Sequence, residues 1–475
     1  MTEKLQYAGE YVVERAVLFT SEGVEVDIKN LIISLDIFED IRINSITGNL
    51  IINDPVAMIS TGPLIGQEYL SLRIKTPSRT KTELFDFTDD LFSITRVADK
   101  KDFEGHQVYT LQMVTHEGVK NMRTKIRRTL VGTESDIVEN LLVNDLQCKK
   151  DLYIEPTDGV RKIIPSNLRP FDLCNQLSKT ACSKEENSPT YYFFETSKGY
   201  HFRSLESMYA QSPKFNFSHN SETGKNTVEG QEDVIAELNE IQAYQANIGS
   251  DSSINLRDGV YASRLITHDI FNKRLDTYTF NYHDSFENQK HINYYDGSTK
   301  DNPMYSEINL EESESSRVSD FPVRTYVSPV SRTTDFLHDS SKQQNTGSFN
   351  ITPYDPERFL MVGSSRKMQL RRGFQINIET KGNTSLNAGD IVTCTLDMNA
   401  SPDGDIYADF KDRFFQGRFL VTAIRHTFDF TSKMHKSLLS LSKDSVGNKP
   451  LGSNFTETRP LTTGRIIKEF YDSSE

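Results

Sequence analysis

Cysteine and tryptophan are scarce in this chain of 475 residues, which contains four cysteines and no tryptophan. The cysteines are Cys148, Cys174, Cys182 and Cys394; none has CxxC spacing and no histidine pair accompanies them. A structural zinc site is therefore not expected. A small secreted scaffold would carry more cysteines, so we expect the chain to fold in a reducing cytosol, that of a host cell.

Long apolar runs are also missing. No run approaches the ~18 apolar residues of a membrane-spanning helix. The segment from Met1 to Tyr7 contains no apolar signal region. We therefore expect no membrane association.

Basic residues do not dominate the sequence. It contains 54 Lys and Arg against 67 Asp and Glu, a formal net charge of -13. Tight binding of nucleic acid depends on clustered Lys and Arg, so this balance excludes a protein that works by holding phosphates. It is compatible with a protein that nucleic acid passes without adhering. The apolar fraction of 36% is modest. For this length we expect three or four domains, and the thin core is typical either of several modest domains or of a protein that completes its burial against partners.

Signatures of catalysis are missing as well. The sequence has no GxSxG, HExxH, Walker or GxGxxG motif. His268 stands beside Asp269, but such a pair on a strand is more often structural than catalytic. Asp403 and Asp405 lack the spacing and the closing glutamate of a calcium-binding loop. We therefore expect no enzyme, no cofactor and no bound metal.

What is present is a β pattern, interrupted by one mixed segment. Alternating runs predict a small antiparallel barrel or sandwich within residues 1–118. Residues 119–242 predict an α+β domain. There, Thr133 to Asp136 is typical of a helix N-terminus, Pro170 suits the first turn of a second helix, and an aromatic hairpin spans 191–202.

The β pattern returns in the later part of the chain. It predicts a second barrel built from residues 243–285 and 370–446. The intervening residues 286–369 form an insertion with an acidic stretch and a helix that opens at Pro356, and residues 447–475 form a C-terminal tail. The fold class expected is mainly β (α+β): two similar antiparallel β-barrel domains, a small α+β domain and an insertion.

The two β regions share an order of motifs, which indicates an internal repeat. In the first, Asp36-Ile-Phe38 precedes a strand that ends at Asp54. In the second, Asp269-Ile-Phe271 precedes a strand that ends at Asp284. Any two β domains show similar alternation, but the shared Asp-Ile-Phe favours duplication over coincidence.

Two further motifs follow in the same order. A turn glycine and an acid open an alternating strand in both regions, as Gly66 with Glu68 and as Gly389 with Asp390. Each region then ends in a hairpin with a polar loop. If the repeat is real, the chain holds two matched barrels.

Five stretches together carry a resemblance to a known family. They are 62–70, 169–177 with the hairpin that ends at 202–205, 262–271, 382–392 and 417–426. With these five stretches in this order along the chain, the sequence resembles the central baseplate hub protein of contractile-tailed phages of the T-even type. That family is related to the hub part of type VI secretion spikes. The long acidic insertion departs from the family pattern.

The resemblance implies a structural protein of the virion tail baseplate. It implies a homotrimeric ring in which two tube-like barrels per chain give pseudo-six-fold symmetry. The implied partners are the tail tube protein, a central spike protein and baseplate wedge proteins, with DNA passing through the lumen without specific binding. A negative wall would keep that DNA from adhering.

Two other functions remain open from the sequence. The chain could be the hub of a type VI secretion or tailocin-like device, which moves protein or ions rather than a genome. It could also be a tail-associated hydrolase or carbohydrate-binding protein. That function calls for paired carboxylates in a cleft or an aromatic platform, and we can place neither in the sequence.

Overall fold

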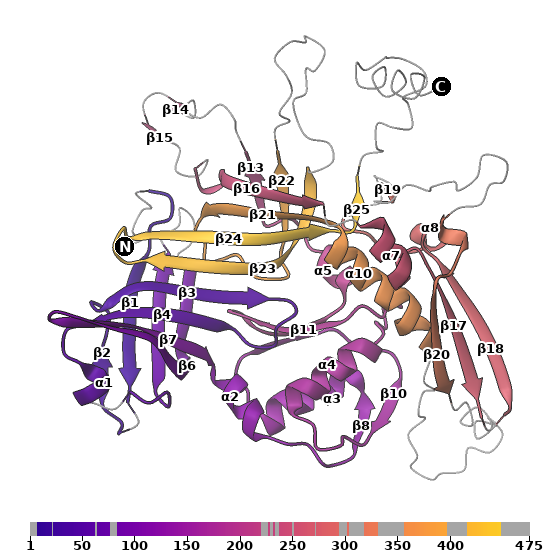
Figure 1. Ribbon diagram of the computed structural model, residues 1–475, viewed down its shortest axis with the longest axis horizontal. Coiled ribbons are helices and arrows are strands. Elements are labelled where there is room, and N and C mark those ends of the chain that lie inside the picture. The colour runs from indigo at the N-terminus through magenta and orange to yellow at the C-terminus, as the bar shows by residue number, and fades with distance from the viewer. Residues whose placement is uncertain are drawn as a thin grey trace.

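The computed structural model of the chain describes residues 7–20, 22–61, 64–76, 83–219, 227–228, 231–232, 237–248, 251–270, 272–293, 302–303, 318–330, 356–396 and 416–447. These residues form a mainly β molecule, as the sequence predicts. Its centre is a 13-stranded, largely antiparallel sheet with strands from both the N-terminal and the C-terminal parts of the chain (Figure 1).

Two sets of strands make up the large sheet. The first set is β1 (Val12–Phe19), β2 (Glu25–Asp27), β3 (Ile32–Asp40), β4 (Thr47–Asp54), β5 (Tyr69–Thr76), β6 (Glu83–Phe103) and β7 (His106–Thr115), with the short helix α1 (Met58–Thr61). The second set is β13 (Phe215–Ser218), β16 (Ile241–Ile248), β21 (Phe374–Lys381), β22 (Ile391–Thr395), β23 (Gly417–Asp429) and β24 (Met434–Lys443). In Figure 1, β16, β21, β24, β23 and β3 follow one another from the top of the view downward.

The two sets repeat one strand order. The first runs β3-β4-β7-β6-β5-β1 and the second runs β16-β21-β24-β23-β22-β13, each step a hydrogen-bonded pair. In chain order the correspondence is β1 with β13, β3 with β16, β4 with β21, and β5, β6 and β7 with β22, β23 and β24. The last step differs, because β1 pairs antiparallel with β5 whereas β13 pairs parallel with β22.

Two of the five register shifts in the ladders of the first set recur at the corresponding places in the second set, which has no others among its described residues. The β6–β7 pair shifts register between Ile94 and Arg96, and the β23–β24 pair shifts between Val421 and Ala423. The β3–β4 pair shifts just after Ile32, and the β16–β21 pair just after Ile241. Residues of the two sets can be matched by starting at either bulge and following the paired residues across the ladders. Both starting points match the same residues, so the similarity between the two sets reaches the level of single residues. Bulges are specific features of a strand pair, which argues for duplication.

Each set of strands encloses its own apolar core. Leu35, Ile37, Leu50 and Leu111 belong to the core of the first set, and alternate residues of their strands face the other way. The second set buries a separate cluster that includes Ile378, Phe419 and Leu439. The ladder does not run fully round either set among the described residues. The second set comes near, since Ser218 at the end of β13 forms an isolated bridge with Glu240.

The α+β region lies below the large sheet in Figure 1. It comprises α2 (His116–Arg123), β8 (Leu130–Thr133), α3 (Glu134–Asn140), η1 (Leu141–Asp145), β9 (Asp151–Ile154), β10 (Val160–Ile163), α4 (Pro170–Thr180), β11 (Tyr192–Thr196), β12 (Gly199–Arg203) and α5 (Leu205–Tyr209). The predicted helix starts are confirmed: Thr133 and Asp136 form a capping box, and Pro170 is the first residue of α4. The predicted aromatic hairpin is β11–β12.

A third sheet lies at the right of Figure 1, in the order β18-β17-β20. Its elements and their neighbours are α7 (Ser252–Asp258), β17 (Ala262–Asp269), β18 (Arg274–Asn281), α8 (Tyr282–Phe286), β20 (Arg324–Val330), η4 (Glu357–Gly363) and α10 (Ser364–Arg372). The helix predicted from Pro356 is confirmed as η4 and α10. The remaining short elements are β14 (Thr227–Val228), β15 (Gln231–Glu232), β19 (Asn302–Pro303), η2 (Val318–Asp320) and β25 (Ser445–Val446).

This third sheet corrects part of the predicted repeat. The Asp269-Ile-Phe271 motif closes β17, which pairs with β18 and β20 and not with the second set. The true counterpart of β3 is β16, and that of β4 is β21. The matches of β5 with β22 and of the β6–β7 hairpin with β23–β24 are confirmed. The acidic stretch of the insertion lies almost entirely outside the described residues, as does the tail.

No helix within the described ranges is long and apolar enough to cross a membrane.

Candidate assembly interface

The two sets of strands meet where β3 pairs antiparallel with β23, from Asp40 opposite Ala423 to Ser34 opposite Asp429. Asp36 lies at the centre of this junction. The Arg425 guanidinium donates to both Asp36 oxygens, at 3.1 and 2.9 Å, and the Thr427 hydroxyl donates to Oδ1 at 2.7 Å.

The same arginine connects the second residue of the first motif to the junction. The Arg425 guanidinium lies 5.6 Å from the centre of the Phe38 ring, a cation–π contact. Asp36 and Phe38, both singled out from the sequence, therefore lie on the same face of β3 and contact one side chain of β23. The sequence did not single out Arg425 or Thr427, because nothing local in the chain shows that β23 lies beside β3.

A buried carboxylate lies at the end of this junction. Glu39 is 2% exposed. It accepts hydrogen bonds from the backbone N–H of Ser197 at 2.8 Å and of Ala388 at 3.1 Å, and from the Asn387 amide at 3.4 Å. Burial raises its pKa to about 7, although these donors act in the opposite direction. Glu39 thus joins the first set of strands to the β11–β12 turn and to the loop before β22.

Glu39→Gln is expected to remove a pH dependence of stability. The folded pKa of about 7 lies above the ordinary value of 4.5, so the folded state binds this proton more tightly than the unfolded state. The contribution of Glu39 is therefore highest below about pH 4.5 and is lost as the pH rises through about 7, by at most roughly 3 kcal/mol. Thermal unfolding midpoints at pH 5 and pH 8 should show wild type losing stability relative to the variant.

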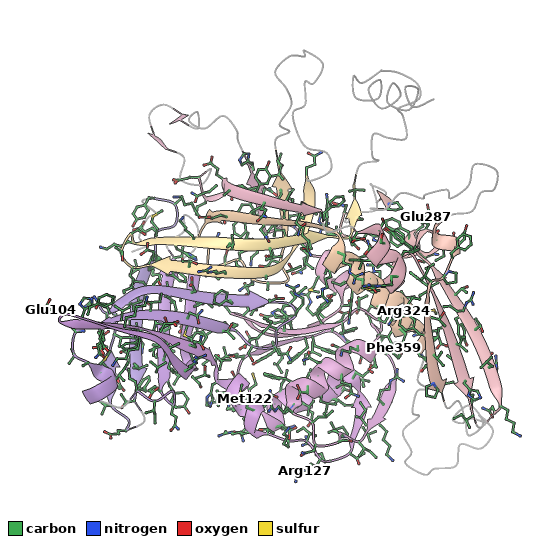
Figure 2. All side chains as sticks on the ribbon, in the orientation of Figure 1. Glu104, Met122, Arg127, Glu287, Arg324 and Phe359 are labelled. Carbon is green, nitrogen blue, oxygen red and sulfur yellow. The ribbon has the colours of Figure 1, made fainter. Side chains whose placement is uncertain are left out.

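The same substitution at an exposed site provides the control. Glu104 lies at the outer tip of the β6–β7 hairpin (Figure 2), and Glu104→Gln should leave the difference between pH 5 and pH 8 as in wild type. A wild type that gains stability relative to Glu39→Gln over the same interval would contradict the assignment.

The acids of the two turn motifs occupy equivalent places. The backbone carbonyl of Glu68 accepts from Ile94 N–H at 2.8 Å, and that of Asp390 accepts from Val421 N–H at 2.9 Å. Ile94 and Val421 are the residues that precede the matching bulges. The two acids, paired by sequence order alone, are therefore brought to equivalent positions in the duplicated strands.

Their side chains also act alike. The Glu68 carboxylate accepts from the backbone N–H of Ile65, Gly66 and Gln67 at 2.7–3.0 Å, and that of Asp390 accepts from Asn387 N–H at 2.8 Å. Each acid thus holds the turn that precedes its own strand.

The two turn glycines have positive φ, +88° at Gly66 and +87° at Gly389, which favours glycine at both places. At Gly389 a Cβ would also lie 2.9 Å from the Phe194 ring.

Asp269 is not brought to an equivalent position. Its carboxylate accepts from the backbone N–H of Asn272 at 3.1 Å and from the Asn272 side-chain amide at 2.8 Å, at the turn after β17. Phe271 lies outside the described residues. The shared Asp-Ile-Phe thus marks two strands in different sheets.

Two buried ionic clusters, which the sequence did not reveal, attach other segments to the large sheet. In the first, Lys150 Nζ lies 3.0 Å from Glu117 and 2.5 Å from Glu195. Glu195 also accepts from the N–H of Ile46, just before β4, and from the hydroxyl of Thr115, the last residue of β7. Burial raises the pKa of Glu195, whereas Lys150 helps to lower that of Glu117. This cluster ties the α+β region to the first set.

The second cluster surrounds Arg366 of α10. Its guanidinium lies 2.9 Å from Glu206 of α5 and 3.7 Å from Asp444, just after β24. It also donates to the Lys290 carbonyl at 2.5 Å. Asp444 in turn lies 3.0 Å from His291 Nδ1. A single guanidinium therefore holds together α10, α5 and the end of the second set.

The described residues contain no group of three His, Cys, Asp or Glu side chains that could hold a metal ion. The cysteines are free thiols, and burial raises the pKa of Cys148 and Cys394 to about 12, so neither forms a thiolate nucleophile near neutral pH. Burial lowers the pKa of His426 to about 4, which keeps this histidine neutral. The polar groups described above join segments of the chain to one another.

Among solved structures, the chain is similar to a tail protein from Neisseria meningitidis MC58, with 10% identity over 92% of this chain and 97% of that chain and a TM-score of 0.48. It is similar to a prophage tail protein from Listeria monocytogenes EGD-e, with 8% identity over 93% and 97% of the two chains and a TM-score of 0.46. A type VI secretion component of E. coli, described as similar to bacteriophage T4 tail proteins, covers 93% and 79% at 7% identity and a TM-score of 0.38. Neither a family model nor a curated protein matches the chain.

Proposed function

We propose that this chain is the structural baseplate hub of a contractile phage tail. In this role three copies form a ring, and the two duplicated units of each chain give the ring six similar segments. Such a ring joins a six-fold tail tube to a three-fold central spike, surrounds the DNA channel and contacts the baseplate wedge proteins. We assign one tube-like barrel to the first set of strands, within residues 1–118, and the other to β13, β16 and β21 to β24, within residues 215–248 and 374–443. The α+β region, the third sheet with its helices and the C-terminal tail are added to them.

The observation that carries the proposal is the duplicated strand order with its matching bulges. Two equivalent units in one chain are what a protein needs to turn three-fold symmetry into six similar surfaces. A ring of three chains with a single unit each could offer only three such surfaces.

The side-chain pattern of the shared sheet is in keeping with a channel wall. On the face opposite the apolar cores, Arg425 is paired with Asp36, and Lys436 donates to Glu379 at 2.8 Å. Pairing with carboxylates neutralises these bases, which lowers their attraction for phosphate. DNA could then pass such a face without being held.

The mass of the purified chain in solution tests the proposal. We expect an assembly with three times the 54.2 kDa of the chain, stable on dilution. A chain that stays monomeric, alone and in the presence of its spike protein, would contradict the hub function.

A further inference from the structure

Two strands of the large sheet have an edge segment that carries no backbone partner among the described residues. One is β6, in which residues 95–103 pair with β7 on one side only. The other is β16, whose residues 241–248 pair with β21 on one side only. Unpaired edges of this length readily pair with a strand of another chain, and soluble proteins generally cover such edges or place charged side chains on them.

The residue correspondence makes these two edges complementary. β6 is the counterpart of β23, and β16 is the counterpart of β3. Since β23 and β3 pair with each other inside the chain, β6 offers the edge that β23 uses and β16 offers the edge that β3 uses. The two edges lie at opposite ends of the eight-strand stretch β16-β21-β24-β23-β3-β4-β7-β6, so the partner each one needs is the other edge of a second copy.

We propose that β6 of one copy pairs antiparallel with β16 of a second copy, in the register of the internal β3–β23 junction. The inference rests on the proposed ring and specifies how its copies join. Arg425 opposite Phe38 corresponds to Ala98 opposite Asn247. Thr427 opposite Asp36 corresponds to Lys101 opposite Gln245, because β6 has one extra residue between Ala98 and Lys101, where its ladder with β7 shifts register. Head-to-tail pairing of this kind closes into a ring when the rotation between copies allows it.

The exposed side chains of the two edges suit this pairing. Phe103, 53% exposed at the end of β6, corresponds to Asp429 and comes opposite the small, exposed Ala243 of β16. Figure 2 shows that this end of β6, beside the labelled Glu104, extends to the outer limit of the molecule. The pairing therefore covers an aromatic ring that is open to water in the single chain.

The new junction differs from the internal one in its charges. Ala98, Asn247 and Gln245 replace Arg425, Phe38 and Asp36, so the ion pair of the internal junction has no counterpart between copies. The joint between copies is held by backbone hydrogen bonds and by burial of the Phe103 ring.

Cysteine cross-linking of the full chain tests the register. Residues opposite each other in an antiparallel pair have Cα atoms about 4.5–5.5 Å apart, within the reach of a disulfide. Ala98→Cys with Asn247→Cys is expected to give covalent multimers after mild oxidation, seen on a non-reducing gel, with three chains as the largest species. Ala98→Cys with Ala243→Cys is the matched control, because the second site is displaced along β16 by roughly 13 Å. Each single-cysteine variant serves as a further control for cross-linking, and a circular dichroism spectrum of each variant checks that it is folded.

The outcomes separate this inference from the proposed function. Multimers from the Ala98 and Asn247 pair alone support the register. A trimer by mass that gives no cross-link with this pair, or that links the control pair equally well, would overturn the register and leave the hub function standing. A chain that gives no cross-links and stays monomeric, both alone and in the presence of its spike protein, would overturn both.

Discussion

Lys150→Met is expected to lower the free energy of unfolding by about 3–5 kcal/mol, because it leaves two buried carboxylates without their cation. The Lys150 side chain is 6% exposed, and those of Glu117 and Glu195 are 4% and 0% exposed. Together the two glutamates raise the pKa of Lys150 despite its burial, so the lysine is charged at ordinary pH. Methionine is close in size to the lysine stem and carries no charge, which isolates the electrostatic loss.

Urea unfolding followed by circular dichroism measures this effect. Lys149→Met makes the same change at the exposed neighbouring position and should stay within about 0.5 kcal/mol of wild type. The deficit of Lys150→Met should also shrink between pH 8 and pH 5, because protonation of the two carboxylates removes their unpaired charge. Equal effects of the two variants would show that the buried cluster does not stabilise the fold.

Arg366→Met is expected to lower the free energy of unfolding by a similar amount, about 3–5 kcal/mol, because it also leaves a buried carboxylate without its cation. The Arg366 side chain is 1% exposed, and its guanidinium forms an ion pair with the buried Glu206 at 2.9 Å. The Lys290 carbonyl and the Gln289 side chain also accept hydrogen bonds from this guanidinium. Its removal leaves Glu206 without its cation, although the Thr190 hydroxyl still donates to this carboxylate, and leaves the Lys290 carbonyl without the guanidinium donor. We therefore expect α10 to be held less firmly against the sheet.

Two further variants sharpen this second prediction. Arg371→Met, on the exposed side of the same helix, should have little effect. Arg366→Lys keeps the charge but cannot reproduce the planar set of donors, so we expect it to lie between wild type and Arg366→Met. If Arg366→Lys matches wild type in a urea titration, the charge alone matters and the geometry of the guanidinium does not.

Much of the local structure could be predicted from the sequence. Period-two alternation in β3, β5 and β7 reflects one face buried in a core and one face outside it, so the strands were visible in the pattern. The helix starts at Thr133 and Pro170 depend on capping chemistry within a few residues, which is equally local. The turn acids Glu68 and Asp390 were found because each holds its own turn.

Other features depend on contacts that no local pattern carries. The polar end of β6, Asp99 to Asp102, looks like a loop in the sequence, although it continues the strand opposite β7. β20 was missed because it contains Pro329 and pairs with β17, which is distant in the chain.

The repeat also depends on contacts between strands that are distant in the chain. The Asp-Ile-Phe motif recurs at β3 and β17, but strand pairing decides membership of a sheet, and it makes β16 the counterpart of β3. Lys150, Glu195 and Arg366 have the composition of surface residues, and only the packing of separate segments buries them. The sequence therefore indicates only part of the candidate interface, namely Asp36 and Phe38. Their partner Arg425 and the unpaired edges of β6 and β16 are identified only by the structure.

The most direct test of the central claim is an electron microscopy image of the assembled chain viewed along its symmetry axis. The duplicated units predict a closed ring with three-fold symmetry and six inner lobes of similar size, formed alternately by the first and second sets of strands. A ring with three lobes, or particles without a ring, would contradict the account.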